Sequence, residues 1–157
     1  MIYQEKVIIP NDLFFDDVIS MLSEGHTVTL RAKGNSMFPF IVSGRDCVVL
    51  QKATHVQAGD IVLARLSGER YVLHRIYYMD KNKVVLMGDG NVRGRERCQR
   101  EDICGIVLKI IRGGRLISCS SAQAQRNFRL WRKLLPVRRY ILAVWYLWRR
   151  WSGKMER

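Results

Sequence analysis

The chain has 157 residues, 48% of them hydrophobic, which excludes a disordered protein and allows one domain with a sizeable core. The formal net charge of +13 is unevenly spread, because residues 121–157 hold 10 Lys and Arg against one acid. No run of about 20 apolar residues predicts a transmembrane helix, and residues 1–10 lack the pattern of a signal peptide, so a cytoplasmic location is expected.

Residues 11–24 predict a short helix that packs on the core. Its apolar side chains recur at helical spacing, and Gly25 follows at its end. They are Leu13, Phe14, Val18, Met21 and Leu22.

From residue 26 to about residue 118, short β-rich runs alternate with turns. The runs are residues 27–30, 47–50, 61–64, 71–73, 84–87 and 106–111, and the turns between them are rich in Gly, Asp and Asn. This spacing predicts a mainly β fold, with an antiparallel, coiled sheet or barrel.

After Ser120 the periodicity becomes helical. Apolar residues form one stripe at spacings of three and four, while Arg132, Arg139 and Arg150 align on another face. Pro136 predicts a kink or a restart of the helix. The stripe comprises Leu134, Val137, Ile141, Val144, Trp148 and Trp151. We therefore predict a β domain over residues 1–120 and a basic, amphipathic tail over residues 121–157.

The cysteines predict neither a metal site nor a cofactor. Cys47, Cys98, Cys104 and Cys119 follow no spacing typical of metal ligands. Free thiols in a reducing compartment are expected.

Three residues at the edges of strand-like runs carry the candidate chemistry. Ser36 lies between Gly34 and Pro39, which favour a tight, stiff turn that holds the serine exposed. His74 alternates with apolar neighbours on a strand and could act as a general base near neutral pH. Asp89, in the turn Gly88-Asp89-Gly90-Asn91, could orient this histidine, although such a turn also forms for local hydrogen bonding. Each residue taken alone is more often structural.

Taken together and in order, these motifs resemble the signal-peptidase and repressor-cleavage superfamily of serine proteases, in its histidine type. The resemblance includes Gly59-Asp60-Ile61-Val62 and Cys104-Gly105-Ile106-Val107, and it covers the chain from Gly34 to about Lys109. It implies a protease domain over residues 1–120, with Ser36 as nucleophile, His74 as general base, and backbone N–H groups at Ser36 for the oxyanion. It also implies a protein or peptide substrate that binds extended, a cut that releases a leader or signal segment, and small side chains at the first and third positions before the cut.

Two departures from the family keep alternatives open. Relatives of the histidine type carry a further acid after the Gly-Asp turn, where this chain has residues 92–95 and then Glu96. Asp89, Glu96 or no acid could complete a triad, and a degenerate scaffold that only binds is the alternative to an enzyme. The usual N-terminal membrane anchor is also missing, which puts ordinary secretory processing in doubt.

The tail has three open interpretations. Its stripe could pack on the β domain, dock on a partner protein, or lie on an anionic membrane surface through residues 126–151, with Trp145, Trp148 and Trp151 at the level of the headgroups. The last would make the protein peripheral at the inner face of a membrane. No specific binding of nucleic acid is expected.

Overall fold

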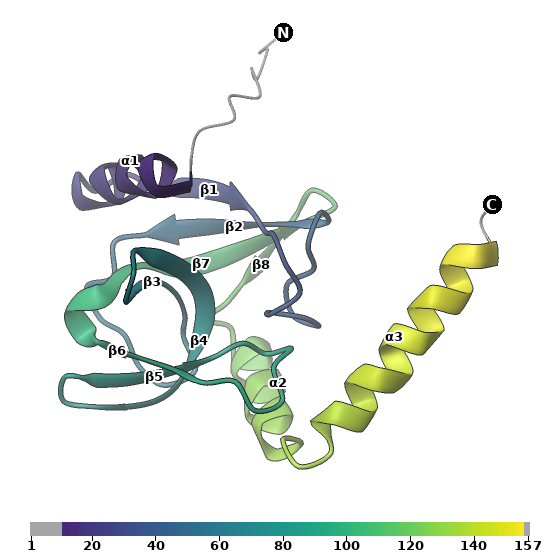
Figure 1. The fold of residues 1–157 in the computed structure, drawn as a ribbon. Coiled ribbons are helices and arrows are strands. Elements are labelled where there is room, and N and C mark those ends of the chain that lie inside the picture. Colours follow the sequence, from purple (N-terminus) through teal and green to yellow (C-terminus); the bar gives the residue numbers. More distant parts are fainter. Residues whose placement is uncertain (1–10, 156–157) are drawn as a thin grey trace, which may run out of the picture.

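The computed structural model describes residues 11–155, without the side chains of residues 11–13 and 153–155. The prediction made for residues 1–10 lies outside this range. Helix α1 (Asn11–Ser23) precedes an eight-stranded sheet, and two helices follow it (Figure 1). The strands are β1 (Val28–Arg31), β2 (Asp46–Gln51), β3 (Ile61–Leu66), β4 (Arg70–Asp80), β5 (Lys83–Met87), β6 (Glu96–Gln99), β7 (Ile103–Arg112) and β8 (Arg115–Ser118). A short 3₁₀ helix, η1 (Arg100–Asp102), joins β6 to β7.

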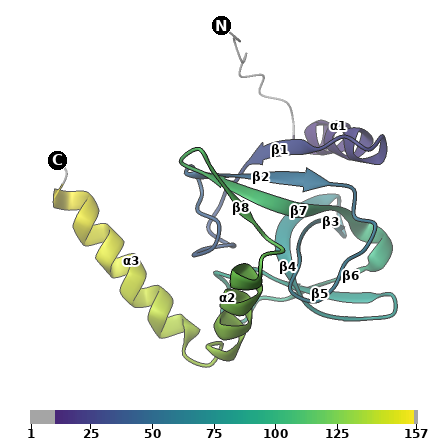
Figure 2. The same cartoon turned by 180° about the vertical axis from the view of Figure 1, so that it is seen from behind.

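The sheet is antiparallel and curls on itself, which confirms the predicted mainly β fold. Its strand order is β1-β2-β7-β3-β4-β5-β6, and β8 pairs with β7. The register shifts within the pairs β2–β7, β3–β7 and β4–β5. Such irregularities bend strands and increase their twist, which gives the coiled shape that Figure 1 and Figure 2 show from opposite sides.

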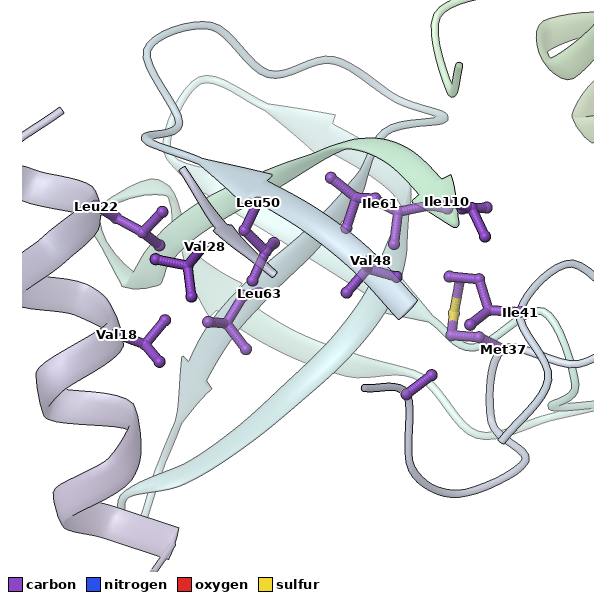
Figure 3. Packing of buried hydrophobic residues seen from close by; sticks show 12 residues of the cluster. Val18, Leu22, Val28, Met37, Ile41, Val48, Leu50, Ile61, Leu63 and Ile110 are labelled. Carbon is purple, nitrogen blue, oxygen red and sulfur yellow. The ribbon is translucent and has the colours of Figure 1, made fainter. Parts of the chain in front are cut away.

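The main core lies between α1 and the curled sheet. Val18 and Leu22, one helical turn apart, point from α1 toward Val28 and Leu63 (Figure 3). Of the other predicted packing residues of this helix, Phe14 and Met21 are exposed, and the side chain of Leu13 lies outside the described residues. The close approach of α1 to β7 depends on Gly105, because an added Cβ would lie 2.9 Å from a methyl carbon of Leu22.

Two edge strands were not predicted. β6 reads Glu-Arg-Cys-Gln and β8 reads Arg-Leu-Ile-Ser, and most of their side chains are exposed or only half-buried. Hydrogen bonds to β5 and β7 hold them in the sheet. Hydrophobic alternation therefore could not reveal them.

The tail forms two helices that break at Pro136, as predicted. They are α2 (Ala122–Lys133) and α3 (Arg138–Met155), and the Ser121 hydroxyl caps α2 by accepting a hydrogen bond from the N–H of Ala124 at 3.1 Å. α2 lies against the β domain, and α3 runs on from it beside the loop between β1 and β2, where Trp145 contacts Phe38 (Figures 1 and 2). The division at residue 120 stays a prediction; β8 ends at Ser118.

The tail packs on the β domain, but mostly through a different face from the predicted stripe, of which only Leu134 joins the packed cluster. The face that packs carries Phe128, Trp131, Leu142 and Trp145. Most of the predicted stripe faces solvent instead. Within residues 11–155, no helix is long and apolar enough to cross a membrane.

Candidate active site

Ser36 lies on the loop between β1 and β2, where buried neighbours hold it at the surface. Gly34 has φ of +77°, a left-handed conformation that suits glycine. Met37 and Phe38 are buried directly after Ser36, which itself stays half-buried. Apolar burial on one side thus fixes a turn whose serine faces a cleft of about 380 Å³.

The Gly88–Asn91 turn packs directly against the serine-bearing turn. The Gly90 N–H donates a hydrogen bond to the carbonyl oxygen of Ser36 at 2.8 Å. A Cβ added to Gly88 would lie 2.3 Å from the same oxygen, and one added to Gly90 would lie 2.5 Å from the carbonyl oxygen of Asn35. Both glycines are needed for this close contact between the two turns. The sequence alone indicated only that residues 88–91 form a hydrogen-bonded turn.

His74 and Glu96 form the other wall of the cleft. His74, on β4, contacts a Glu96 carboxylate oxygen through Nδ1 at 2.8 Å, and Glu96 begins β6. The side chain of His74 is 6% exposed and that of Glu96 is 21% exposed. In the neutral tautomer with its proton on Nδ1, the imidazole donates this hydrogen bond to the carboxylate and its Nε2 is free to accept a proton, as a general base must.

Ser36 and His74 line the same cleft without a direct hydrogen bond between them in the described structure. Catalytic hydrogen bonds are often longer in ligand-free proteins and tighten when the substrate binds. The cleft thus brings Ser36, His74 and Glu96 together on three separate segments of the chain.

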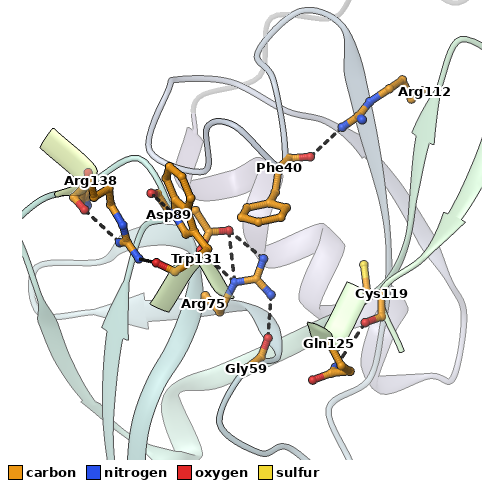
Figure 4. Close-up of polar contacts among 10 residues, drawn as sticks. Phe40, Gly59, Arg75, Asp89, Arg112, Cys119, Gln125, Trp131 and Arg138 are labelled. Atoms are coloured by element: carbon orange, nitrogen blue, oxygen red, sulfur yellow. Dashed lines mark hydrogen bonds and ion pairs between the residues drawn. The ribbon is translucent and has the colours of Figure 1, made fainter. Parts of the chain in front are cut away.

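Asp89 does not orient His74, and this candidate role is corrected by the structure. Its carboxylate accepts hydrogen bonds from Arg75, from Nε at 2.9 Å and from Nη2 at 2.7 Å, in a buried, bidentate pair (Figure 4). Arg75 also donates to the carbonyl oxygen of Gly59 at 2.8 Å. The physical reason is the pleat of β4: His74 and Arg75 are consecutive, so their side chains leave opposite faces and reach different acids.

The tail helices brace the turn that carries Asp89. The indole N–H of Trp131, on α2, donates to the carbonyl oxygen of Asp89 at 2.9 Å. Arg138, at the start of α3, donates to the carbonyl oxygen of Trp131 at 3.0 Å (Figure 4). It also donates to the carbonyl oxygen of Asn91 at 3.2 Å. Burial lowers the pKa of the Arg138 guanidinium. No signal in the sequence indicated that the tail would support the candidate site.

α3 also contacts the serine-bearing loop itself. The rings of Phe38 and Trp145 lie 4.0 Å apart, centroid to centroid, and Phe38 is fully buried. Phe38 is two residues from Ser36, so the tail reaches both turns that shape the cleft.

The described residues form neither a disulfide nor a cluster of metal ligands. All four cysteines are free, and burial raises the pKa of Cys98 and of Cys119 to about 11, so both remain thiols at neutral pH. Within residues 11–155, no cluster of three or more His, Cys, Asp or Glu side chains could hold a metal ion.

A curled antiparallel sheet with a serine turn and a histidine strand on one cleft is the architecture of a serine-peptidase scaffold. The family model described as Peptidase S24-like matches residues 3–111. The chain therefore belongs to the Peptidase S24-like family, which confirms the resemblance seen in the motifs. No curated protein matches the sequence.

Proposed function

We propose that this protein is a serine endopeptidase that removes a leader or signal segment from a protein substrate, with Ser36 as nucleophile and His74 as general base. Glu96 is the residue that positions the imidazole. The observation that carries the proposal is the 2.8 Å contact between His74 Nδ1 and Glu96 on the wall of the cleft that Ser36 lines. It supplies the acid that the motifs alone did not identify.

The chemistry follows from this arrangement. The Ser36 hydroxyl attacks the scissile carbonyl carbon while His74 Nε2 takes its proton, and the imidazolium that forms is stabilised by Glu96. Backbone N–H groups at Ser36 hold the negative oxygen of the tetrahedral intermediate. His74 then gives the proton to the leaving amine, the C–N bond breaks, and water releases the acyl group from Ser36 by the same steps.

The walls of the cleft suit an extended peptide. Residues 70–74 of β4 pair with β3 on one side, and β5 joins the other side only from Arg75 onward. This leaves backbone donors and acceptors along the cleft, which residues 32–34 also line. A substrate strand could add to these groups, and side chains as small as Ala32 leave room for the small residues expected before the cut.

Labelling with a fluorophosphonate probe tests the nucleophile without knowledge of the substrate. We expect the wild type to be modified at Ser36 alone, and Ser36→Ala and His74→Ala to lose labelling. Thermal unfolding should stay unchanged in Ser36→Ala, whereas His74→Ala removes a buried side chain and should unfold at a lower temperature while still being folded at the assay temperature. Ser43→Ala is the matched control, since this half-buried serine lies on the same loop. It should label as the wild type does.

Two results would overturn the proposal. Labelling that survives Ser36→Ala would place the nucleophile elsewhere. Absence of labelling in the wild type over a range of pH, with no new termini when leader peptides are incubated with it, would favour the binding scaffold.

A further inference from the structure

An exposed apolar stripe runs along α3, on the side away from the contacts with the β domain. Val144 is 67% exposed, Leu147 63%, Trp148 65% and Trp151 79%. The stripe also includes Val137, Tyr140 and Ile141, which are exposed as well. Scattered apolar residues are normal on a protein surface, but a contiguous row of six on one face of α3, with Val137 directly before the helix, indicates an interaction surface.

Arginines border this stripe on both sides. An α-helix turns by about 100° per residue, so Arg139 and Arg150 lie beyond one edge of the stripe, and Arg149 lies beyond Trp145 on the other side, with its guanidinium 5.6 Å from the centre of that ring. All three are exposed. Guanidinium groups beside a row of Trp, Tyr, Leu and Val match the layers of a bilayer surface, where phosphates lie above the acyl chains and Trp and Tyr prefer the boundary.

The buried face of α3 fixes the helix to the candidate site. Leu142 and Trp145 pack on the loop of Ser36, and Arg138 binds the turn of Asn91. One face of the helix thus holds it in place on the β domain, and the exposed stripe on the other face is free to contact another surface. Whatever binds the stripe is brought close to the cleft.

We propose that this stripe binds the surface of a membrane rich in anionic lipids, with α3 lying in the plane of the headgroups. The charge favours a membrane over a second copy of the chain. Two copies meeting at this face would bring two sets of arginines together, whereas anionic lipids neutralise them. Such binding would hold the cleft beside substrates that are themselves anchored in the membrane.

Sedimentation of the full chain with lipid vesicles tests this inference. We expect binding to phosphatidylcholine vesicles that contain about a third phosphatidylserine, weaker binding to phosphatidylcholine alone, and weakening by salt. The fluorescence of the exposed Trp148 and Trp151 should shift to the blue on binding. Leu147→Glu should weaken binding by about tenfold or more.

Leu116→Glu is the matched control. Leu116 lies on β8 and is 63% exposed, as Leu147 is, so both variants place the same charge at an equally exposed leucine. Since both side chains face solvent, neither change should alter thermal unfolding. Leu116→Glu should bind vesicles as the wild type does.

Several outcomes would overturn the inference. They are equal binding by the two leucine variants, equal binding to neutral and anionic vesicles, and no binding by the wild type. A dimer in sedimentation velocity that Leu147→Glu dissociates, without vesicle binding, would assign the stripe to a second copy instead. Ser36→Ala should bind vesicles normally, so failure of the proposed peptidase activity and failure of membrane binding can be told apart.

Discussion

Replacing Glu96 by Gln removes the charge that faces His74 while keeping the size of the side chain. Gln can still accept a hydrogen bond from Nδ1 through its amide oxygen, but it cannot stabilise the imidazolium by charge. We expect Glu96→Gln to slow the acylation of Ser36 and to leave the fold intact.

The structure sets the size of this effect. The contact between Nδ1 and the carboxylate is 2.8 Å long, and Glu96 is only 21% exposed, so solvent screens the pair in part. Hydrogen bonds to charged groups contribute about 1.5–3 kcal/mol. Loss of this contribution in the transition state corresponds to a rate about 10- to 150-fold lower.

Asp89→Asn is the contrasting change, because this acid lies on the other face of β4. Its carboxylate pairs with Arg75, and both side chains are buried. Removing one partner of a buried pair leaves an uncompensated charge and costs about 3–5 kcal/mol. For a chain of this size, the midpoint of thermal unfolding should fall by about 10 °C.

The assay combines the rate of fluorophosphonate labelling with thermal unfolding of the same samples, at a temperature where all variants are folded. Glu96→Gln should lower the rate alone, and Asp89→Asn should lower mainly the stability. The assignment of the two acids would be refuted if Asp89→Asn slowed labelling without loss of stability while Glu96→Gln labelled at the wild-type rate.

Two further predictions concern the support of the site. Gly88→Ala should abolish labelling, since a Cβ there would lie 2.3 Å from the Ser36 carbonyl oxygen. Gly44→Ala is the control, because no atom lies within 4 Å of its added Cβ and the change should strain only its own turn. Equal labelling of the two variants would contradict the close packing of the Gly88–Asn91 turn on the serine-bearing turn. Burial would raise the pKa of Asp46, but hydrogen bonds from Arg45, Arg112 and the Val42 N–H outweigh it and hold the pKa well below its usual range. The folded-state pKa lies below the unfolded value, so this stabilisation is present above about pH 5 and is lost as the pH falls further. Asp46→Asn should lower the free energy of unfolding by about 2 kcal/mol near neutral pH, a modest loss because the arginines are partly exposed. Urea unfolding measured at several pH values should show that the stability of this variant falls less steeply at acid pH than that of the wild type. An equally steep fall would contradict the role of the Asp46 carboxylate.

The local signals in the sequence predicted the elements whose pattern is repeated along the chain. Val18 and Leu22 mark the helix by their spacing, and the β-rich runs mark the inner strands. Side chains alternate between buried and half-buried along β2 and are all buried except Arg65 along β3. β6 escaped prediction because an edge strand needs no apolar face. Its absence from the predicted fold also hid the place of Glu96, which begins that strand.

Local patterns in the sequence could not predict which side chains pair with one another. Asp89 and Glu96 are both near His74 in sequence order, and only the curl of the sheet shows which of them meets the imidazole. The tail is a similar case. Its apolar stripe was visible as a period, but the face that packs was set by contacts with Asp89, Asn91 and Phe38, which come from distant parts of the chain.

The order of the Ser36, His74 and Gly-Asp-Gly-Asn motifs along the chain was sufficient to predict the family, and strand periodicity was sufficient to predict the mainly β fold, because both are local properties. The catalytic roles of Ser36 and His74 stay predictions. The acid that meets His74, the ion pair between Arg75 and Asp89, and the exposed face of α3 depend on tertiary structure. The pleat of β4 sends adjacent side chains to opposite faces, and the packing of the tail buries one side of a helix and leaves the other free.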